Sequence, residues 1–246
     1  MNEERLRRSR SFGAVARAYD EFRPGPPAEA RRLYGDLTSK DVLELGAGTG
    51  LLTRYLESLG ANVTTVEPDE NMREVLEERS PDISSLNAVA QSLPLAEASM
   101  DLVVASSAWH WFPQPDTSLE VARVLRGAGR LIIVGLGFDG DVDWTASIGS
   151  LRNHGTDLTD RNYLASVPTQ GPFEVTLHED VPYLWKRTPE QVVGLFNTYS
   201  ATIIKSEHER EQLSREVEAL LAPHVVDGLV ELPMKMTFME FCRLPR

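Results

Sequence analysis

Short runs rich in hydrophobic and β-branched residues alternate along the chain with segments in which hydrophobic residues recur every three to four positions. The runs at 42–45, 62–66 and 101–105 are typical of buried parallel strands. Between the first two runs, the apolar residues have helical spacing and end at a glycine stop: Leu51, Leu52, Tyr55, Leu56, Leu59 and Gly60. This alternation predicts an α/β fold.

The amino-terminal segment is predicted to be helical. Apolar residues in it recur at helical spacing: Phe12, Val15, Ala16 and Tyr19. We therefore expect one helix within residues 1–20. It ends at the Arg-Pro-Gly-Pro-Pro segment 23–27, where no helix continues, and a second helix is expected over 28–34.

The second half of the chain contains two strong helix starts and one long polar stretch. Thr188 with Gln191, and Ser206 with Glu209, have the spacing of capping boxes and predict two consecutive helices. The polar stretch between Gly137 and Gly171 predicts a loop or insertion over the site, with a short helix in it. The ranges expected here are helices over 117–125 and 144–152 and strands over 130–134, 173–185 and 230–241.

Three alternating glycines follow the first predicted strand directly. Gly46, Gly48 and Gly50 permit a tight backbone turn on which a ligand can lie without meeting side chains. Glu67 ends the next predicted strand, 21 residues after Gly46. Nucleotide-binding folds place at this position the carboxylate that accepts hydrogen bonds from ribose hydroxyls. The pattern therefore predicts a nucleoside site.

A dinucleotide is one candidate for this site, and two residues count against it. The spacing is G-x-G-x-G, and Leu51 occupies the position that the dinucleotide fingerprint reserves for its third glycine. Glu44, two residues before the first glycine, suits a ligand with an amino group or a sulfonium and would repel a diphosphate. A positively charged nucleoside is favoured over NAD.

These motifs resemble those of the class I S-adenosylmethionine-dependent methyltransferases, whose first motif is E/D-x-G-x-G-x-G. The loop 88–95, the strand after it and the segment Ala-Trp-His-Trp-Phe at 108–112 resemble the small-molecule branch that includes trans-aconitate methyltransferases. The resemblance implies a Rossmann-like, seven-stranded and mostly parallel sheet with helices on both faces. It also implies an antiparallel hairpin formed by the last two strands.

The resemblance further implies which residues hold S-adenosylmethionine. One departure is Val89, which stands where many relatives carry an Asp for the adenine amino group, so backbone near Ala90 and the side chain of Gln91 or Ser92 are expected to replace it. Met72 is expected to pack either on adenine or in the core. The residues expected to bind the cofactor are Tyr19, Arg23, Glu44, Gly46, Ala47, Gly48, Gly50, Glu67, Pro68, Met72, Ala90, Gln91 and Ser106.

Methyl transfer from a sulfonium is an in-line displacement, so the enzyme mainly aligns the donor and the acceptor and excludes water. A carboxylate acceptor needs no base, whereas a neutral histidine can take the proton from a hydroxyl. His110, just after the strand over 101–105, is the candidate, and a positioning role is favoured over a base role. Tyr19 and Tyr199 are the other candidates for the reaction centre.

Composition narrows the partners and the compartment. The net charge of −12 argues against binding to nucleic-acid backbone or anionic membranes and favours a small-molecule substrate. Cys242 is the only cysteine, so a disulfide framework is excluded and a cytoplasmic location is expected. The histidines lack ligand spacing, so no metal site is expected, and no segment resembles a spanning helix.

We expect a single methyltransferase domain over residues 1–246, with an oligomeric state that the sequence leaves open. Its parts are an amino-terminal helical cap (1–35), a cofactor-binding core (36–138), an insertion over the site (139–170), and carboxyl-terminal strands and substrate-side helices (171–246). The expected reaction is methyl transfer to an oxygen of a small molecule. The alternative is a protein that binds S-adenosylmethionine without methyl transfer, or a fold member recruited to another reaction.

Overall fold

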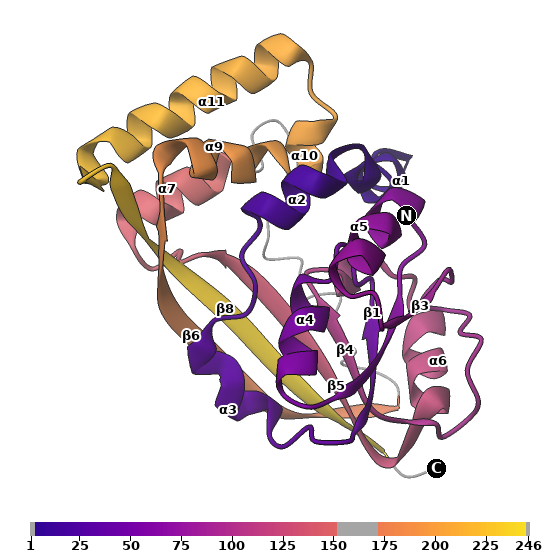
Figure 1. Ribbon diagram of the computed structural model, residues 1–246. Helices are drawn as coiled ribbons and strands as arrows, with labels where there is room; N and C mark the ends of the chain where they lie inside the picture. Colours follow the sequence, from indigo (N-terminus) through magenta and orange to yellow (C-terminus); the bar gives the residue numbers. More distant parts are fainter. Residues whose placement is uncertain (1–2, 152–171, 245–246) are drawn as a thin grey trace.

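A twisted, mostly parallel sheet forms the centre of the molecule (Figure 1), and the computed structural model describes residues 3–151 and 172–244. Its strand order is β3-β2-β1-β4-β5-β8-β6, with the short β7 paired to β8 outside this path. The strands are β1 (Asp41–Leu45), β2 (Asn62–Val66), β3 (Ser84–Leu86), β4 (Met100–Ser106), β5 (Leu125–Phe138), β6 (Phe173–Arg187), β7 (Val225–Val226) and β8 (Leu229–Arg243).

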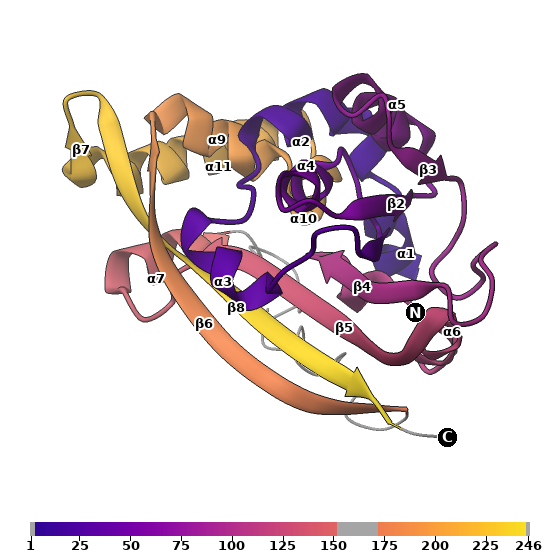
Figure 2. The same ribbon diagram turned by 60° about the horizontal axis from the view of Figure 1, so that its bottom comes forward.

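The strands β1 to β5 are parallel, whereas β8 is antiparallel to both β5 and β6. Figure 2 shows β6 and β8 as a long curved pair at the edge of the sheet. The expected parallel sheet with an antiparallel carboxyl-terminal pair is thus confirmed. The predicted seven strands become eight because the two residues of β7 pair with β8.

Helices of at least four residues surround the sheet, together with short 3-10 turns. The helices are α1 (Glu3–Ser9), α2 (Ala16–Phe22), α3 (Arg31–Tyr34), α4 (Leu51–Ser58), α5 (Glu70–Arg79), α6 (Asp116–Val124), α7 (Asp143–Leu151), α9 (Pro189–Asn197), α10 (Ser200–Ile203) and α11 (Glu207–Leu221). The 3-10 turns are η1 (Phe12–Val15), η2 (Ala28–Ala30), η3 (Trp109–Trp111) and η4 (Ala222–His224). No helix in the described ranges is long and apolar enough to cross a bilayer.

Two apolar cores lie on the two faces of the sheet. Successive side chains of a strand point to opposite faces, so Leu43 joins the core that contains α6, and Val42 joins the core that contains α3 and α4. Burial of such side chains contributes about 1.5 to 3 kcal/mol each. The expected helices on both faces are confirmed.

A third core forms beyond the carboxyl ends of the parallel strands. It joins α7, α9 and α11 to the ends of β6 and β8, and Figure 1 shows these helices together at the top of the molecule with α2 beside them. The contact between α2 and α9 is close, because a Cβ on Gly194 would lie 2.8 Å from the ring of Phe22. An amino-terminal helix and a helix from residues 189–197 therefore meet over one edge of the sheet.

The two capping boxes form as predicted and begin α9 and α11. The expected single helix within residues 1–20 is wrong: the chain forms α1, η1 and α2 instead. The interruption brings Gly13 against Asp69, where a Cβ would lie 2.3 Å from the carboxylate Oδ1. That contact is tertiary and has no signal in the local pattern.

The predicted second helix over 28–34 forms as η2 followed by α3, and the helix expected over 144–152 forms as α7. Most of the predicted insertion, residues 152–170, lies outside the described residues. β5 is longer than the apolar run that predicted it, because pairing with β8 continues to Phe138. The short strand β3 was not predicted, because its residues are polar or only half-buried.

Candidate cofactor and active site

Two adjoining cavities open where the parallel strands end, beneath the amino-terminal helices. The larger has a volume of about 430 Å³ and the smaller about 40 Å³. Both are lined by Tyr19, Gly46, Ser106 and Ser107, so they meet at the ends of β1 and β4. Open α/β sheets bind ligands at this edge.

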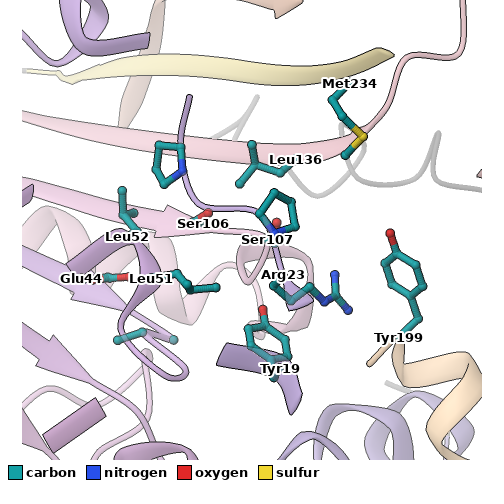
Figure 3. Close-up of a pocket in the computed structure, with 14 residues that line it drawn as sticks. Tyr19, Arg23, Glu44, Leu51, Leu52, Ser106, Ser107, Leu136, Tyr199 and Met234 are labelled. Carbon is teal, nitrogen blue, oxygen red and sulfur yellow. The ribbon is translucent and has the colours of Figure 1, made fainter. Parts of the chain in front are cut away.

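Most of the predicted site residues line one of these cavities or both. Those on the larger cavity are Tyr19, Gly46, Gly48, Glu67, Pro68, Met72, Ala90, Gln91 and Ser106. Those on the smaller cavity are Tyr19, Arg23, Glu44, Gly46, Ala47, Ser106 and Tyr199, of which Figure 3 labels the majority. Gly50 and His110 line neither cavity.

The glycine turn needs glycine for both conformation and space. Gly46 and Gly48 have φ values of 65° and 59°, in the left-handed region. A Cβ on Gly46 would also lie 2.8 Å from the Cβ of Ala108. The amides of Gly46 and Ala47 both donate to the carbonyl of Val66, at 2.8 and 3.2 Å, and join the turn to the end of β2. Gly50 (φ 84°) starts α4.

Glu67 is oriented by backbone amides on both sides of its carboxylate. Oε2 accepts from the amide of Gly48 at 2.9 Å, and Oε1 accepts from the amide of Asp69 at 3.0 Å. Glu67 is only 8% exposed, and this burial raises the pKa of its carboxyl group. Each carboxylate oxygen can accept more than one hydrogen bond, so the side chain is positioned to receive the hydroxyls of a ligand.

Glu44 is the most deeply buried acid of the site. Its Oε2 accepts from the hydroxyl of Thr53 at 2.6 Å, and the residue is 1% exposed. Burial raises the pKa of Glu44 to about 8. A cation in the smaller cavity would stabilise the ionised form, because opposite charges attract strongly at low effective dielectric.

Arg23 lies between two aromatic rings at the side of the smaller cavity (Figure 3). Its guanidinium carbon is 4.9 Å from the ring centroid of Tyr19 and 4.2 Å from that of Tyr199. Burial raises the pKa of Tyr19, so its hydroxyl stays neutral. The two predicted tyrosines, which are far apart in the sequence, are thereby brought together around one cation.

Met72 forms part of the wall of the larger cavity. It is 4% exposed and packs in a small core with Ala16 and Val75 while also lining the cavity. The two predicted roles, core packing and a wall of the nucleoside site, are therefore compatible. Val89 and Gln91 line the same cavity in a tight turn, in which Val89 forms an isolated bridge with Ser92.

His110 lies in η3, beside the cavities. Its ring packs against Trp111 with a centroid separation of 4.5 Å, while Trp109 is fully buried. Its neighbours Ala108 and Trp111, not His110 itself, line the larger cavity. Both roles predicted for His110, positioning and general base, stay predictions.

Several wall residues were missed by sequence reasoning. Phe12 packs edge-on against Tyr19 and Trp111, at centroid separations of 5.9 and 6.1 Å, and closes the larger cavity together with Ser9 and Arg10. The helical spacing of Phe12 marked it as apolar and buried. Its contact with Trp111 joins distant parts of the chain, so its place in a ligand site had no local signal.

The fold and the site define a class of protein: a Rossmann-like methyltransferase with a glycine turn, an acidic residue after β2 and a second acid before the turn. A model of the methyltransferase domain matches residues 43–133. An uncharacterized methyltransferase of Mycobacterium tuberculosis is 34% identical over 217 residues, which cover 88% of this chain and 87% of the relative. The chain belongs to the class I S-adenosylmethionine-dependent methyltransferases.

Other relatives and solved structures agree with this family. A methyltransferase-like protein of Schizosaccharomyces pombe is 28% identical over 73% of this chain and 72% of its own. A protein of Anaeromyxobacter dehalogenans described as a type II methyltransferase has the same fold, with a TM-score of 0.69 at 21% identity, covering 92% of this chain and all of that one. Geranyl diphosphate C-methyltransferase from Streptomyces coelicolor, solved with S-adenosylhomocysteine, superposes with a TM-score of 0.50 at 13% identity, covering 88% and 79%.

Proposed function

We propose that this enzyme transfers the methyl group of S-adenosylmethionine to an oxygen, a carboxylate or a hydroxyl, of a small molecule. The observation that carries the proposal is the pairing of the Gly48 amide with the Glu67 carboxylate at 2.9 Å, inside a cavity that continues to Glu44 and Arg23. The donor set fits the cofactor. A carboxylate suits ribose hydroxyls, a buried acid suits an ammonium, and a guanidinium suits a carboxylate.

This assignment places the adenosine in the larger cavity and the amino-acid part in the smaller one. Pro68, Met72, Ala90 and Gln91 would then contact the adenosine, and Ala47 and the glycines would approach the ligand with backbone. The reactive sulfur would lie near residues shared by both cavities, Tyr19 and Ser106 among them.

The cofactor supplies an activated methyl group, and the residues of this chain align the acceptor and exclude water. Orientation alone can lower a barrier by about 7 to 11 kcal/mol when the geometry is near-attack. Leu52, Leu136 and Met234 make the smaller cavity partly apolar, and Tyr199 adds an aromatic wall with a polar end. These walls would line the aliphatic part of the bound cofactor, next to where a small organic acceptor would approach the methyl group. His110 would position the neighbouring wall, or take a proton if the acceptor is a hydroxyl.

A net charge of −12 favours a small-molecule partner over nucleic acid. We also propose a single domain and a cytoplasmic location.

The first test is titration calorimetry with S-adenosylhomocysteine and with NAD. Binding of the former alone supports the proposal, and binding of NAD alone contradicts it. Turnover of S-adenosylmethionine with a panel of small carboxylic acids and hydroxylated metabolites then separates the enzyme from the non-catalytic alternative.

A further inference from the structure

The turn between α9 and α10 contains Thr198, whose hydroxyl donates one hydrogen bond and accepts another. Thr198 is fully buried and is the C-cap residue of α9. Its hydroxyl donates to the carbonyl of Leu195 at 2.7 Å. A hydroxyl has one proton, so the same oxygen can act only as an acceptor towards any other partner.

That other partner is Arg23. Nε of Arg23 donates to the Thr198 hydroxyl oxygen at 2.8 Å, and Nη2 donates to the Thr198 carbonyl oxygen at 2.9 Å. A carbonyl at a helix carboxyl end lacks an intrahelical donor and carries partial negative charge, so a guanidinium is a favourable partner. Thr198, between α9 and α10, therefore holds one edge of the guanidinium through two donors.

These contacts leave the rest of the fork for a ligand. Nη1 makes no hydrogen bond within residues 3–151 and 172–244, and Arg23 lines the smaller cavity. The guanidinium carbon lies over the rings of both Tyr19 and Tyr199, at 4.9 and 4.2 Å from their centroids. The two rings confine the guanidinium, and the two hydrogen bonds to Thr198 orient its donors.

We propose that Thr198 is a positioning residue that orients Arg23 to bind the carboxylate of the amino-acid part of the cofactor. This inference rests on the proposed function. An arginine recognises a carboxylate by two parallel N–H donors, which requires a defined orientation. Thr198 supplies that orientation through the hydroxyl, which valine lacks and serine retains.

The proposal predicts a loss confined to ligands that carry the amino-acid part. S-adenosylhomocysteine and 5′-methylthioadenosine share the adenosine and the sulfur, and only the former has the carboxylate. Thr198→Val is expected to weaken S-adenosylhomocysteine binding about threefold to tenfold, the range for loss of one hydrogen bond, and to leave 5′-methylthioadenosine binding unchanged. Thr198→Ser is expected to bind both ligands like the wild-type chain.

The measurement is titration calorimetry of the full chain with both ligands, below the melting temperature of each variant. Arg23→Gln is expected to show the same selective loss of affinity for S-adenosylhomocysteine. Adding Thr198→Val to Arg23→Gln should lower this affinity little further, because both substitutions act on one contact. If Thr198→Val does not fold, Thr198→Ala removes the same hydroxyl. Equal loss for both ligands, or no loss, would overturn the proposal. A wild-type chain that binds neither ligand would instead contradict the proposed function itself.

Discussion

The amide of Gly48 donates to the carboxylate of Glu67 at 2.9 Å and joins the turn after β1 to the acid after β2. The two residues are 19 positions apart in the sequence. The turn also depends on two amides that donate to the carbonyl of Val66. The ligand-facing backbone and the ligand-facing carboxylate therefore form one unit, and a change in either should affect the same binding step.

Glu67→Ala is expected to weaken binding of S-adenosylhomocysteine. Each hydrogen bond to a charged group is worth about 1.5 to 3 kcal/mol, so the dissociation constant should rise at least tenfold. Calorimetry measures the change. Glu70→Ala is the matched control, because Glu70 is exposed on α5 and lines neither cavity. Affinity that stays unchanged in Glu67→Ala would show that this carboxylate does not hold the ribose.

Glu44→Gln is expected to stabilise the unliganded protein at neutral pH and to weaken cofactor binding. Folding raises the pKa of Glu44 from 4.5 to about 8, so the folded state binds this proton more tightly than the unfolded state. Glu44 therefore lowers the free energy of unfolding progressively as the pH rises from about 4.5 to 8. The total loss is at most about 5 kcal/mol. The substitution removes this pH dependence, because an amide does not titrate in this range.

Thermal melts at pH 5 and pH 8 test the Glu44 prediction. The gain in melting temperature from the substitution should be larger at pH 8 than at pH 5. Wild-type binding of S-adenosylhomocysteine at pH 7 should also release a proton, because the ligand ammonium favours the ionised carboxylate. The same gain at both pH values would mean that Glu44 is ionised in the folded state across the whole range.

Gly46→Ala is expected to disrupt the turn. The residue has a φ of 65°, and the added Cβ would lie 2.8 Å from the Cβ of Ala108. Strain of this kind costs on the order of 1 to 3 kcal/mol, so both the free energy of unfolding and cofactor affinity should fall. Gly140→Ala is the control, since nothing lies within 4 Å of its Cβ position. Denaturant titration should show a loss only for Gly46→Ala.

His110→Ala is expected to reduce turnover mildly, because the ring packs on Trp111 and lines neither cavity. A general base contributes about 10²- to 10⁴-fold, so loss of a base would nearly abolish activity with a hydroxyl acceptor. Initial rates of methyl transfer distinguish the two. A loss of about 10²-fold or more, with cofactor affinity retained, would establish the base role instead.

Much of the fold was encoded in local pattern. The apolar runs predicted β1, β2 and β4, and the capping boxes at Thr188 and Ser206 predicted where α9 and α11 begin. Both signals depend on neighbours a few residues apart, so they are present in the sequence itself. The helix interruption near Gly13, where the chain packs against Asp69, had no such signal, because the contact is tertiary.

By itself, the sequence predicted the nucleoside-binding turn, because alternating glycines between a strand and a helix, with an acid at the end of the next strand, are typical of such a site. Only the tertiary structure decided what closes the site. Phe12 reaches the larger cavity, and Thr198 holds Arg23 from a position 175 residues away. Contacts over such separations depend on how the amino-terminal helices pack against distant segments over the sheet, and no local periodicity records that packing.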